Sequence, residues 1–181
     1  MFIDKQVTAI SNKGGSKTMN QIEKFWTMIY SDDEEMREEG FDKWSEFKHN
    51  NPQYMETIKE SFSNGFYKEY QGKVLHDFHV LNVEVLCNTC PPRNTEIKLL
   101  LYDFYKEYGK DLYFYLKYTG VQSYSFYSHD TDVETSWYDD IFEVTADGML
   151  KHRIALIGDA YIEITFKKIR MIKAKKREVF V

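Results

Sequence analysis

Residues that could bind a metal ion are concentrated in one short stretch of the sequence: His76, Asp77, His79, Cys87 and Cys90. Thiolate and imidazole groups are the usual ligands of zinc, and the adjacent His76 and Asp77 would suit a metal-assisted hydrolase. If residues 79–87 form one extended strand, however, about 26 Å separates its two ends, which is too far for one tetrahedral site. We therefore expect no metal and no cofactor, and keep these residues as the alternative.

A second group of reactive residues combines aromatic rings with carboxylates: Trp137, Tyr138, Asp139, Asp140 and Glu143. Acid/base hydrolysis requires two carboxyl groups that face each other across a cleft, about 5–9 Å apart. Asp139 and Asp140 would point to opposite faces of a strand. A pairing of Asp139 with Glu143, or of either of these two acids with His152, stays open. We predict no catalytic residue and interpret the group as a partner-binding surface.

Charge is unevenly distributed along the chain. The 24 Lys and Arg residues and 29 Asp and Glu residues give a formal net charge of −5. Residues 167–177 carry seven Lys or Arg and no acid, which leaves 17 basic against 29 acidic residues elsewhere. An acidic body repels the phosphates of nucleic acids, whereas it can steer onto a basic protein. We therefore expect a protein partner and no nucleic acid.

The sequence lacks the usual targeting signals. Its first residues contain no long apolar core and no small-residue cleavage site. No apolar run approaches the roughly 18 residues that a membrane span needs, and two Cys exclude a disulfide scaffold. These observations predict a cytoplasmic protein that does not contact a membrane.

The first part of the chain has the periodicity of helices. An apolar stripe with a spacing of three or four residues predicts the first helix: Ile22, Phe25, Trp26, Ile29 and Tyr30. Ser31 and Glu34 have the spacing of a capping box, which predicts the start of a second helix, with Gly40 as a candidate break. Pro52 is typical of a first helical position, and a third helix is expected from there to about Tyr70.

After residue 72 the period changes to two, as in β-strands. Alternating segments predict six or seven strands, at about residues 81–87, 97–102, 112–118, 122–128, 137–145, 149–157 and 161–170. Asp147-Gly148 is a strong hairpin signal between two of these segments. Because short turns join the strands, neighbouring strands can pair only antiparallel.

These elements predict an α+β fold, in which about three N-terminal helices precede a six- or seven-stranded antiparallel β meander. We expect a flexible lead-in over residues 1–17, a helical segment over 18–71 that packs on the sheet, an antiparallel β domain over 72–170 and a basic C-terminal tail over 171–181. Together these parts would form a single compact domain.

Short motifs in the strands carry a family resemblance. Leu75-His76-Asp77 opens the first strand, and Trp137-Tyr138-Asp139-Asp140-Ile141 opens a later one. This pattern resembles an uncharacterised α+β domain family of Gram-positive spore-forming bacteria, over about residues 75–168. The sequence departs from the family at Asp140, where the family pattern favours Glu. The resemblance implies a fold and a bacterial source but no activity.

Taken together, the sequence predicts a non-enzymatic, partner-binding protein of unknown function. In size and charge it is similar to immunity proteins that neutralise bacterial toxins, so a basic protein is the expected partner. Two alternatives stay open. One is a metal-assisted hydrolase that uses His76 and Asp77, and the other is a small-ligand or sugar-binding β domain that uses exposed Trp137 and Tyr side chains.

Overall fold

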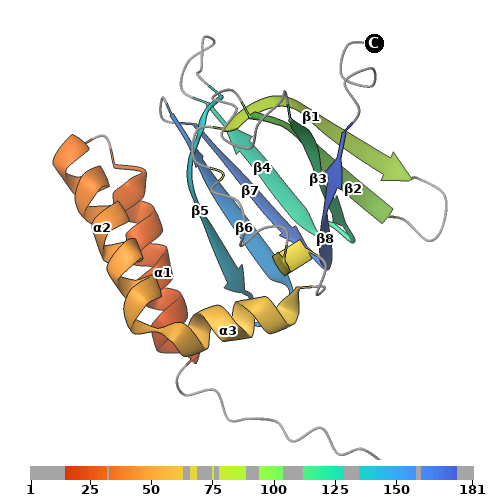
Figure 1. Ribbon diagram of the computed structural model, residues 1–181. Helices are drawn as coiled ribbons and strands as arrows, with labels where there is room; N and C mark the ends of the chain where they lie inside the picture. The colour runs from red at the N-terminus through yellow and green to blue at the C-terminus, as the bar shows by residue number, and fades with distance from the viewer. Residues whose placement is uncertain are drawn as a thin grey trace, which may run out of the picture. The chain divides into compact units, whose positions relative to one another are not determined.

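Helices precede strands along the chain, which confirms the predicted α+β class (Figure 1). The computed structural model describes the following residues: 15–31, 33–62, 66–68, 75, 78–88, 94–103, 112–128, 135–157 and 160–174. The chain forms two compact units, Met1–Asn50 and Asn51–Val181. This boundary places the third helix with the strands, in the second unit.

The first unit contains two helices, α1 (Gly15–Ile29) and α2 (Glu34–Asn50), which pack against each other. The predicted apolar stripe lies on α1, and four of its members are buried: Ile22, Phe25, Trp26 and Ile29. The centroid of the Phe25 ring lies 5.6 Å from that of Phe47 on α2. The apolar faces of the two helices therefore meet, as the hydrophobic periodicity of α1 requires.

Gly40 does not break α2, because the helix runs without interruption from residue 34 to residue 50. Its lack of a side chain serves the contact between the helices instead. A Cβ atom at this position would lie 2.8 Å from the backbone nitrogen of Ile29 and 2.9 Å from Cβ of Met28. Glycine therefore permits a close approach of α1 that a larger residue would prevent.

The start of α2 is capped by Asp33 and not by the predicted capping box. Oδ1 of Asp33 accepts hydrogen bonds from the backbone N–H groups of Glu35 at 3.0 Å and of Met36 at 3.3 Å. The hydroxyl of Ser31 accepts from the N–H of Asp33, at 3.2 Å. Asp is as good an N-cap residue as Ser, and its negative charge favours the helix N-terminus.

The described part of the second unit contains helix α3 (Pro52–Ser61), a short helical stretch at residues 66–68, and eight strands: β1 (Phe78–Asn88), β2 (Asn94–Asp103), β3 (Tyr113–Thr119), β4 (Ser123–Tyr127), β5 (Trp137–Val144), β6 (Leu150–Leu156), β7 (Ala160–Phe166) and β8 (Lys168–Lys173). The strands form two antiparallel sheets. We name the sheet of order β1-β2-β3-β8 sheet A, and the sheet of order β4-β7-β6-β5 sheet B. The predicted Asp147-Gly148 turn joins β5 to β6, and Gly148 has a φ of 76°.

Two strands continue from one sheet into the other. The predicted strand over residues 161–170 is divided at Lys167 into β7 and β8, and β3 runs on into β4 past Gly120. The N–H of Lys167 donates to the carbonyl of Thr119, at 3.2 Å. Gly120 has a φ of 65°, and a Cβ there would lie 3.1 Å from the Lys167 side chain. Both strands therefore bend at one place, and β3 and β4 do not form a hairpin.

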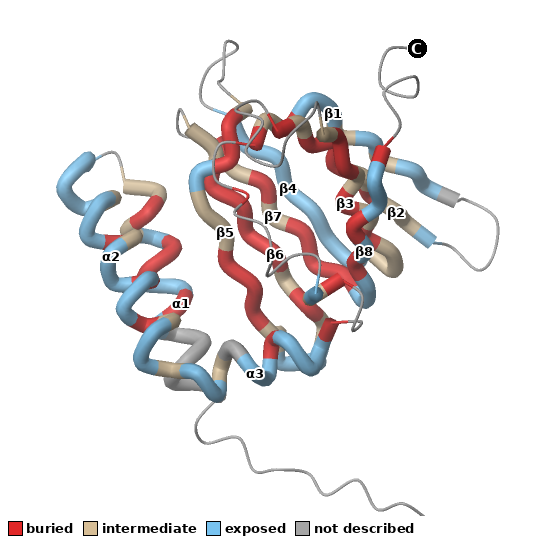
Figure 2. The backbone as a smooth tube through the Cα atoms, in the orientation of Figure 1, coloured by how far each residue is buried: buried red, intermediate tan, exposed pale blue. Residues whose placement is uncertain are grey.

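The main core lies between the two sheets. It combines side chains from sheet A, such as Leu99 and Leu116, with side chains from sheet B, such as Ile154 and Ile164, all of them fully buried. Figure 2 shows buried positions along the inner strands of both sheets. β1 also pairs with the residue that precedes β5, because His79 forms an isolated antiparallel bridge with Ser136. The packing of the two sheets on each other brings residues of β3, in sheet A, close to residues of β5 and β6, in sheet B.

Candidate functional site

A buried polar cluster joins the two sheets. The imidazole of His152 on β6 lies between Tyr118 on β3 and Asp140 on β5. Oη of Tyr118 is 2.8 Å from Nδ1, and Oδ2 of Asp140 is 2.9 Å from Nε2. The Phe142 ring stacks on the imidazole with centroids 3.8 Å apart. These groups have the chemistry of a proton relay, but His152 is 0% exposed, so no solute reaches its ring in this structure.

A β-bulge places Asp140 in this cluster. The register of β5 against β6 shifts between Trp137 and Asp139, so Tyr138 is an extra residue on β5. With strict alternation, Asp139 would share the face of Trp137. Because of the bulge, Asp140 instead of Asp139 lies on the same face as Trp137. The acid that pairs with His152 is therefore Asp140, and not Asp139 or Glu143, the two acids that the sequence left open for this pairing.

Burial controls the protonation of the cluster. It lowers the pKa of His152, while the hydrogen bond and negative charge of Asp140 act in the opposite direction with smaller effect. Burial, followed by the charge of Asp140, raises the pKa of Tyr118 well above its usual value. Because a carboxylate only accepts hydrogen bonds, Nε2 of the neutral imidazole carries the proton and Nδ1 accepts from the Tyr118 hydroxyl.

Tyr118 is the member of the cluster that sequence reasoning missed. It lies 34 residues before His152, on a strand of the other sheet, and no local pattern connects the two. The sequence does contain a pattern that indicates the position of His152. It alternates with Leu150 and Ile154, which places it on the apolar face of a strand. A histidine in that position is typical of a hydrogen-bonded core residue.

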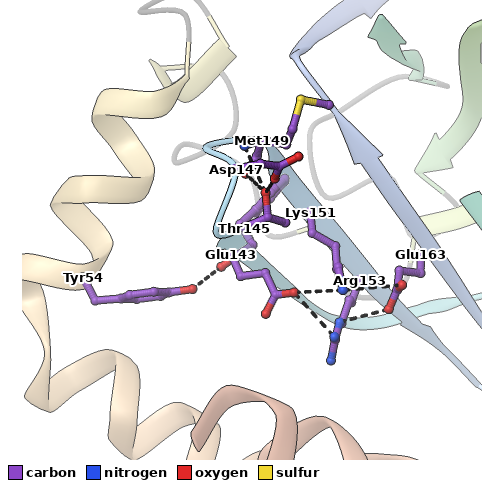
Figure 3. Close-up of polar contacts among 9 residues, drawn as sticks. Tyr54, Glu143, Thr145, Asp147, Met149, Lys151, Arg153 and Glu163 are labelled. Carbon is purple, nitrogen blue, oxygen red and sulfur yellow. Dashed lines mark hydrogen bonds and ion pairs between the residues drawn. The ribbon is translucent and has the colours of Figure 1, made fainter. Parts of the chain in front are cut away.

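A second polar cluster lies on the opposite face of sheet B (Figure 3). Nη2 of Arg153 is 3.4 Å from Oε1 of Glu143, and its Nε is 3.0 Å from Oε2 of Glu163. Nζ of Lys151 is 3.2 Å from Oε1 of Glu143 and 3.7 Å from Oε1 of Glu163. Arg153 is 2% exposed and Glu143 is 5% exposed. Two cations thus face two carboxylates, and their ion pairs tie β5, β6 and β7 together.

Helix α3 reaches β5 beside this ion-pair cluster (Figure 3). The hydroxyl of Tyr54 donates a hydrogen bond to the backbone carbonyl of Phe142. Burial, with the charge of Glu143 as the second cause, raises the pKa of Tyr54, and Arg153 opposes the shift. The ring of Phe62 meets that of Phe142 edge to face, with centroids 4.8 Å apart. α3 is therefore fixed to sheet B by polar and aromatic contacts.

The predicted metal ligands are not gathered into a site in the part of the chain that the structure describes. His79 lies near the start of β1, with Nε2 at 3.3 Å from the Ser136 hydroxyl, and Cys87 is exposed near the other end of the same strand. Their separation along an extended strand is too large for one ion. The other three candidates lie outside the described residues: His76, Asp77 and Cys90. The hydrolase alternative stays a prediction.

The five residues of the predicted partner-binding group do not form one surface, because they lie in different environments along β5. Trp137 is 1% exposed and lies in the core, Asp140 belongs to the histidine cluster, and Glu143 belongs to the ion-pair cluster. Tyr138 is 38% exposed, and Asp139 is half-buried. At the surface of this structure, a partner would therefore contact Tyr138 and Asp139, while the other three residues support the fold.

Strand β4 is exposed along its whole length, at one end of sheet B (Figure 2). Its residues Tyr124, Phe126 and Tyr127 are 45%, 41% and 47% exposed. The rings of Tyr124 and Phe126 lie 5.5 Å apart on one face, opposite Ile164 and Ile162 of β7. An exposed aromatic group on an edge strand is typical of an interaction site.

Comparison of the chain with protein-family models, with curated proteins and with solved structures found no match. Among the described residues, no helix is long and apolar enough to cross a membrane. Function is therefore inferred from the geometry of the two polar clusters and of β4.

Proposed function

We propose that this protein is a non-enzymatic binding protein that recognises a partner protein through the edge strand β4. The observation that supports the proposal is that β4 is an edge strand of sheet B and that all five of its residues are exposed, three of them aromatic. The outer edge of such a strand offers N–H and C=O groups to an additional strand. An incoming peptide would gain backbone hydrogen bonds along β4 and side-chain contacts with its rings.

The aromatic side chains give the proposed contact its specificity. Tyr124 and Phe126 lie on the same face of the strand, and Tyr127 stacks on Tyr161 of β7, with centroids 5.3 Å apart. Aromatic residues are enriched at protein interfaces because they bury a large area at a small loss of conformational entropy. A partner with an apolar, extended segment would fit this surface.

The placement of the titratable groups also supports binding over catalysis. The Tyr118–His152–Asp140 cluster is buried between the sheets, and the buried Arg153 and Glu143 pair on the other face of sheet B. Tyr118, His152 and Asp140 are hydrogen-bonded to one another, and Arg153 and Glu143 form ion pairs within sheet B. Such clusters stabilise and specify a fold, which here holds β4 in position.

The proposal is tested by capturing partners from the cells that produce the protein, with three tagged forms. These are the wild type, Tyr124→Ser/Phe126→Ser, and the control Leu81→Ser/Leu86→Ser. The control removes two leucines of comparable exposure, 47% and 39%, from the edge strand β1. Circular dichroism and the unfolding midpoint would first verify that all three are folded.

We expect a partner protein in stoichiometric amount with the wild type and the control, and its loss with the β4 variant. Equal capture by the wild type and the β4 variant would exclude β4 as the binding site. Loss with both variants would indicate a general effect of surface hydrophobicity and would also contradict the proposal.

A further inference from the structure

β4 differs from the other three edges of the sheets, which carry features that prevent strand pairing. β8 carries three basic residues, β5 carries three acidic residues and a bulge, and β1 carries Glu84 and a bulge. Charges and bulges are the common means by which proteins protect an edge from another strand. β4, with the sequence Ser-Tyr-Ser-Phe-Tyr, has neither a charge nor a bulge in its ladder with β7.

In β4 the central Ser125 is flanked by two aromatic residues, whereas the outer pair of residues differs in type. Ser123 and Tyr127 lie two positions away on either side, and Tyr124 and Phe126 lie one position away. In an antiparallel pair of two β4 strands with its two-fold axis at Ser125, each Tyr124 would face the other copy's Phe126. The small Ser125 side chains would meet at the axis. Aromatic pairs directly opposite one another are among the favourable cross-strand pairs.

Electrostatics does not oppose this pairing. β4 contains no charged residue, so no like charges would face each other across the new ladder. The nearest acid by register is Glu163, which is opposite Ser125 on β7. With strands about 4.8 Å apart, the two copies of Glu163 would be separated by about 14 Å, which exceeds the Debye length at physiological salt.

We propose that the partner of β4 is a second copy of this chain, which adds its own β4 antiparallel and joins two copies of sheet B into one eight-stranded sheet. The inference rests on the proposed function, because it names the partner of the same strand. The interface is isologous, as in most homodimers. A five-residue strand pair is a small interface, so the dimer dissociates on dilution.

Disulfide trapping tests the register. In a Cys87→Ser/Cys90→Ser background, Ser125→Cys places two thiols at the two-fold axis, within the Cα separation of about 4.4–6.8 Å that a disulfide requires. The matched control Ser123→Cys is also an exposed serine on the same face of β4. Its two copies would be about 14 Å apart. Under mild oxidation we expect at least about tenfold more crosslinked dimer from Ser125→Cys than from Ser123→Cys.

Sedimentation of the wild type and of Ser125→Lys over a range of concentrations tests the association itself. Two lysines at the axis repel each other, so we expect a concentration-dependent dimer for the wild type and a monomer for the variant. Ser45→Lys, an exposed position on α2, adds the same charge and should leave the dimer intact.

A wild type that stays monomeric, equal crosslinking of the two cysteine variants, or a dimer that survives Ser125→Lys would each overturn the inference. The proposed function would be unaffected by these results if Tyr124→Ser/Phe126→Ser still lost a different captured protein. In that case β4 binds another chain and not itself.

Discussion

The Tyr118 hydroxyl and Nδ1 of His152 are 2.8 Å apart and connect the two sheets across the core. Both side chains are completely buried, and the far nitrogen of the imidazole is bound by Asp140. Phenol, imidazole and carboxylate thus form one chain of hydrogen bonds in which each polar group has a partner. Water cannot replace a lost partner at this depth, so the chain is sensitive to substitution and to protonation.

Tyr118→Phe removes the hydroxyl and leaves Nδ1 of His152 without its donor inside the core. We expect the free energy of unfolding to fall by about 1–3 kcal/mol, the usual penalty for an unsatisfied buried acceptor. Urea denaturation measures it. Tyr115→Phe, on the same strand but half-buried, is the control and should change stability by less than about 0.5 kcal/mol. Equal effects of the two substitutions would contradict the importance of this hydrogen bond.

Protonation of His152 should destabilise the fold. Its pKa is lowered by burial, so the unfolded chain binds this proton at a higher pH than the folded chain. The stabilisation is complete above the unfolded pKa of about 6.5 and is lost as the pH falls from there toward the folded value. His152→Gln keeps an amide donor and a carbonyl acceptor but does not titrate.

Urea denaturation of wild type and His152→Gln between pH 8 and pH 5 tests this prediction. The wild type should lose stability more steeply below about pH 6.5, with an excess slope of at most about 1.4 kcal/mol per pH unit, the limit for one proton. Parallel curves for the two proteins would mean that another group causes the acid sensitivity.

Local patterns predicted the elements of this fold well. The apolar stripe that contains Ile22 and Phe25 forms the buried face of α1, and Asp147-Gly148 forms the turn between β5 and β6. Both depend on residues that are close in sequence, where periodicity and turn preferences act directly. No local sequence pattern predicts that one strand is divided at Lys167 into β7 and β8. The division goes with the bend at Gly120, which lies next to Lys167 in space but is distant from it in sequence.

The site was less predictable because it depends on contacts between distant residues. One extra residue at Tyr138 decides that Asp140, and not Asp139, reaches His152, and alternation alone assigns the wrong acid to that face. The exposure of β4 depends on where Tyr124 lies in the sheet order, which a run of alternating residues does not reveal.

Gly40→Ala should destabilise the helical unit, although alanine normally stabilises a helix by about 1 kcal/mol relative to glycine. The new methyl group would lie 2.8 Å from the backbone nitrogen of Ile29, which cannot move without separating the helices. We expect a net loss of about 1–3 kcal/mol, as for an overpacked core. Circular dichroism at the helical band during urea denaturation measures it.

The control for this substitution is Ser45→Ala, at an exposed position of the same helix. Alanine there adds helix propensity without a new contact, so stability should be unchanged or rise by a few tenths of a kcal/mol, about the difference in propensity. A Gly40→Ala variant as stable as Ser45→Ala would show that the two helices can separate without loss.

The ion-pair cluster on sheet B should depend unequally on its two carboxylates. Glu143 is nearly completely buried and faces both Arg153 and Lys151, whereas the side chain of Glu163 is 29% exposed. Glu143→Gln leaves the buried guanidinium with a single carboxylate, and we expect a loss of about 2–4 kcal/mol. Glu163→Gln should lose less than Glu143→Gln, because the Glu163 carboxylate is partly exposed and water already screens its charge.

An apolar replacement of the pair separates the effect of an uncompensated charge from the value of the ion pair itself. Glu143→Leu/Arg153→Met removes both charges, so no buried ion is left without a counter-ion. Such replacements are often neutral or stabilising, and we expect this double variant to be more stable in urea denaturation than Glu143→Gln. A double variant less stable than Glu143→Gln would instead mean that the pair contributes more to the fold than its desolvation costs.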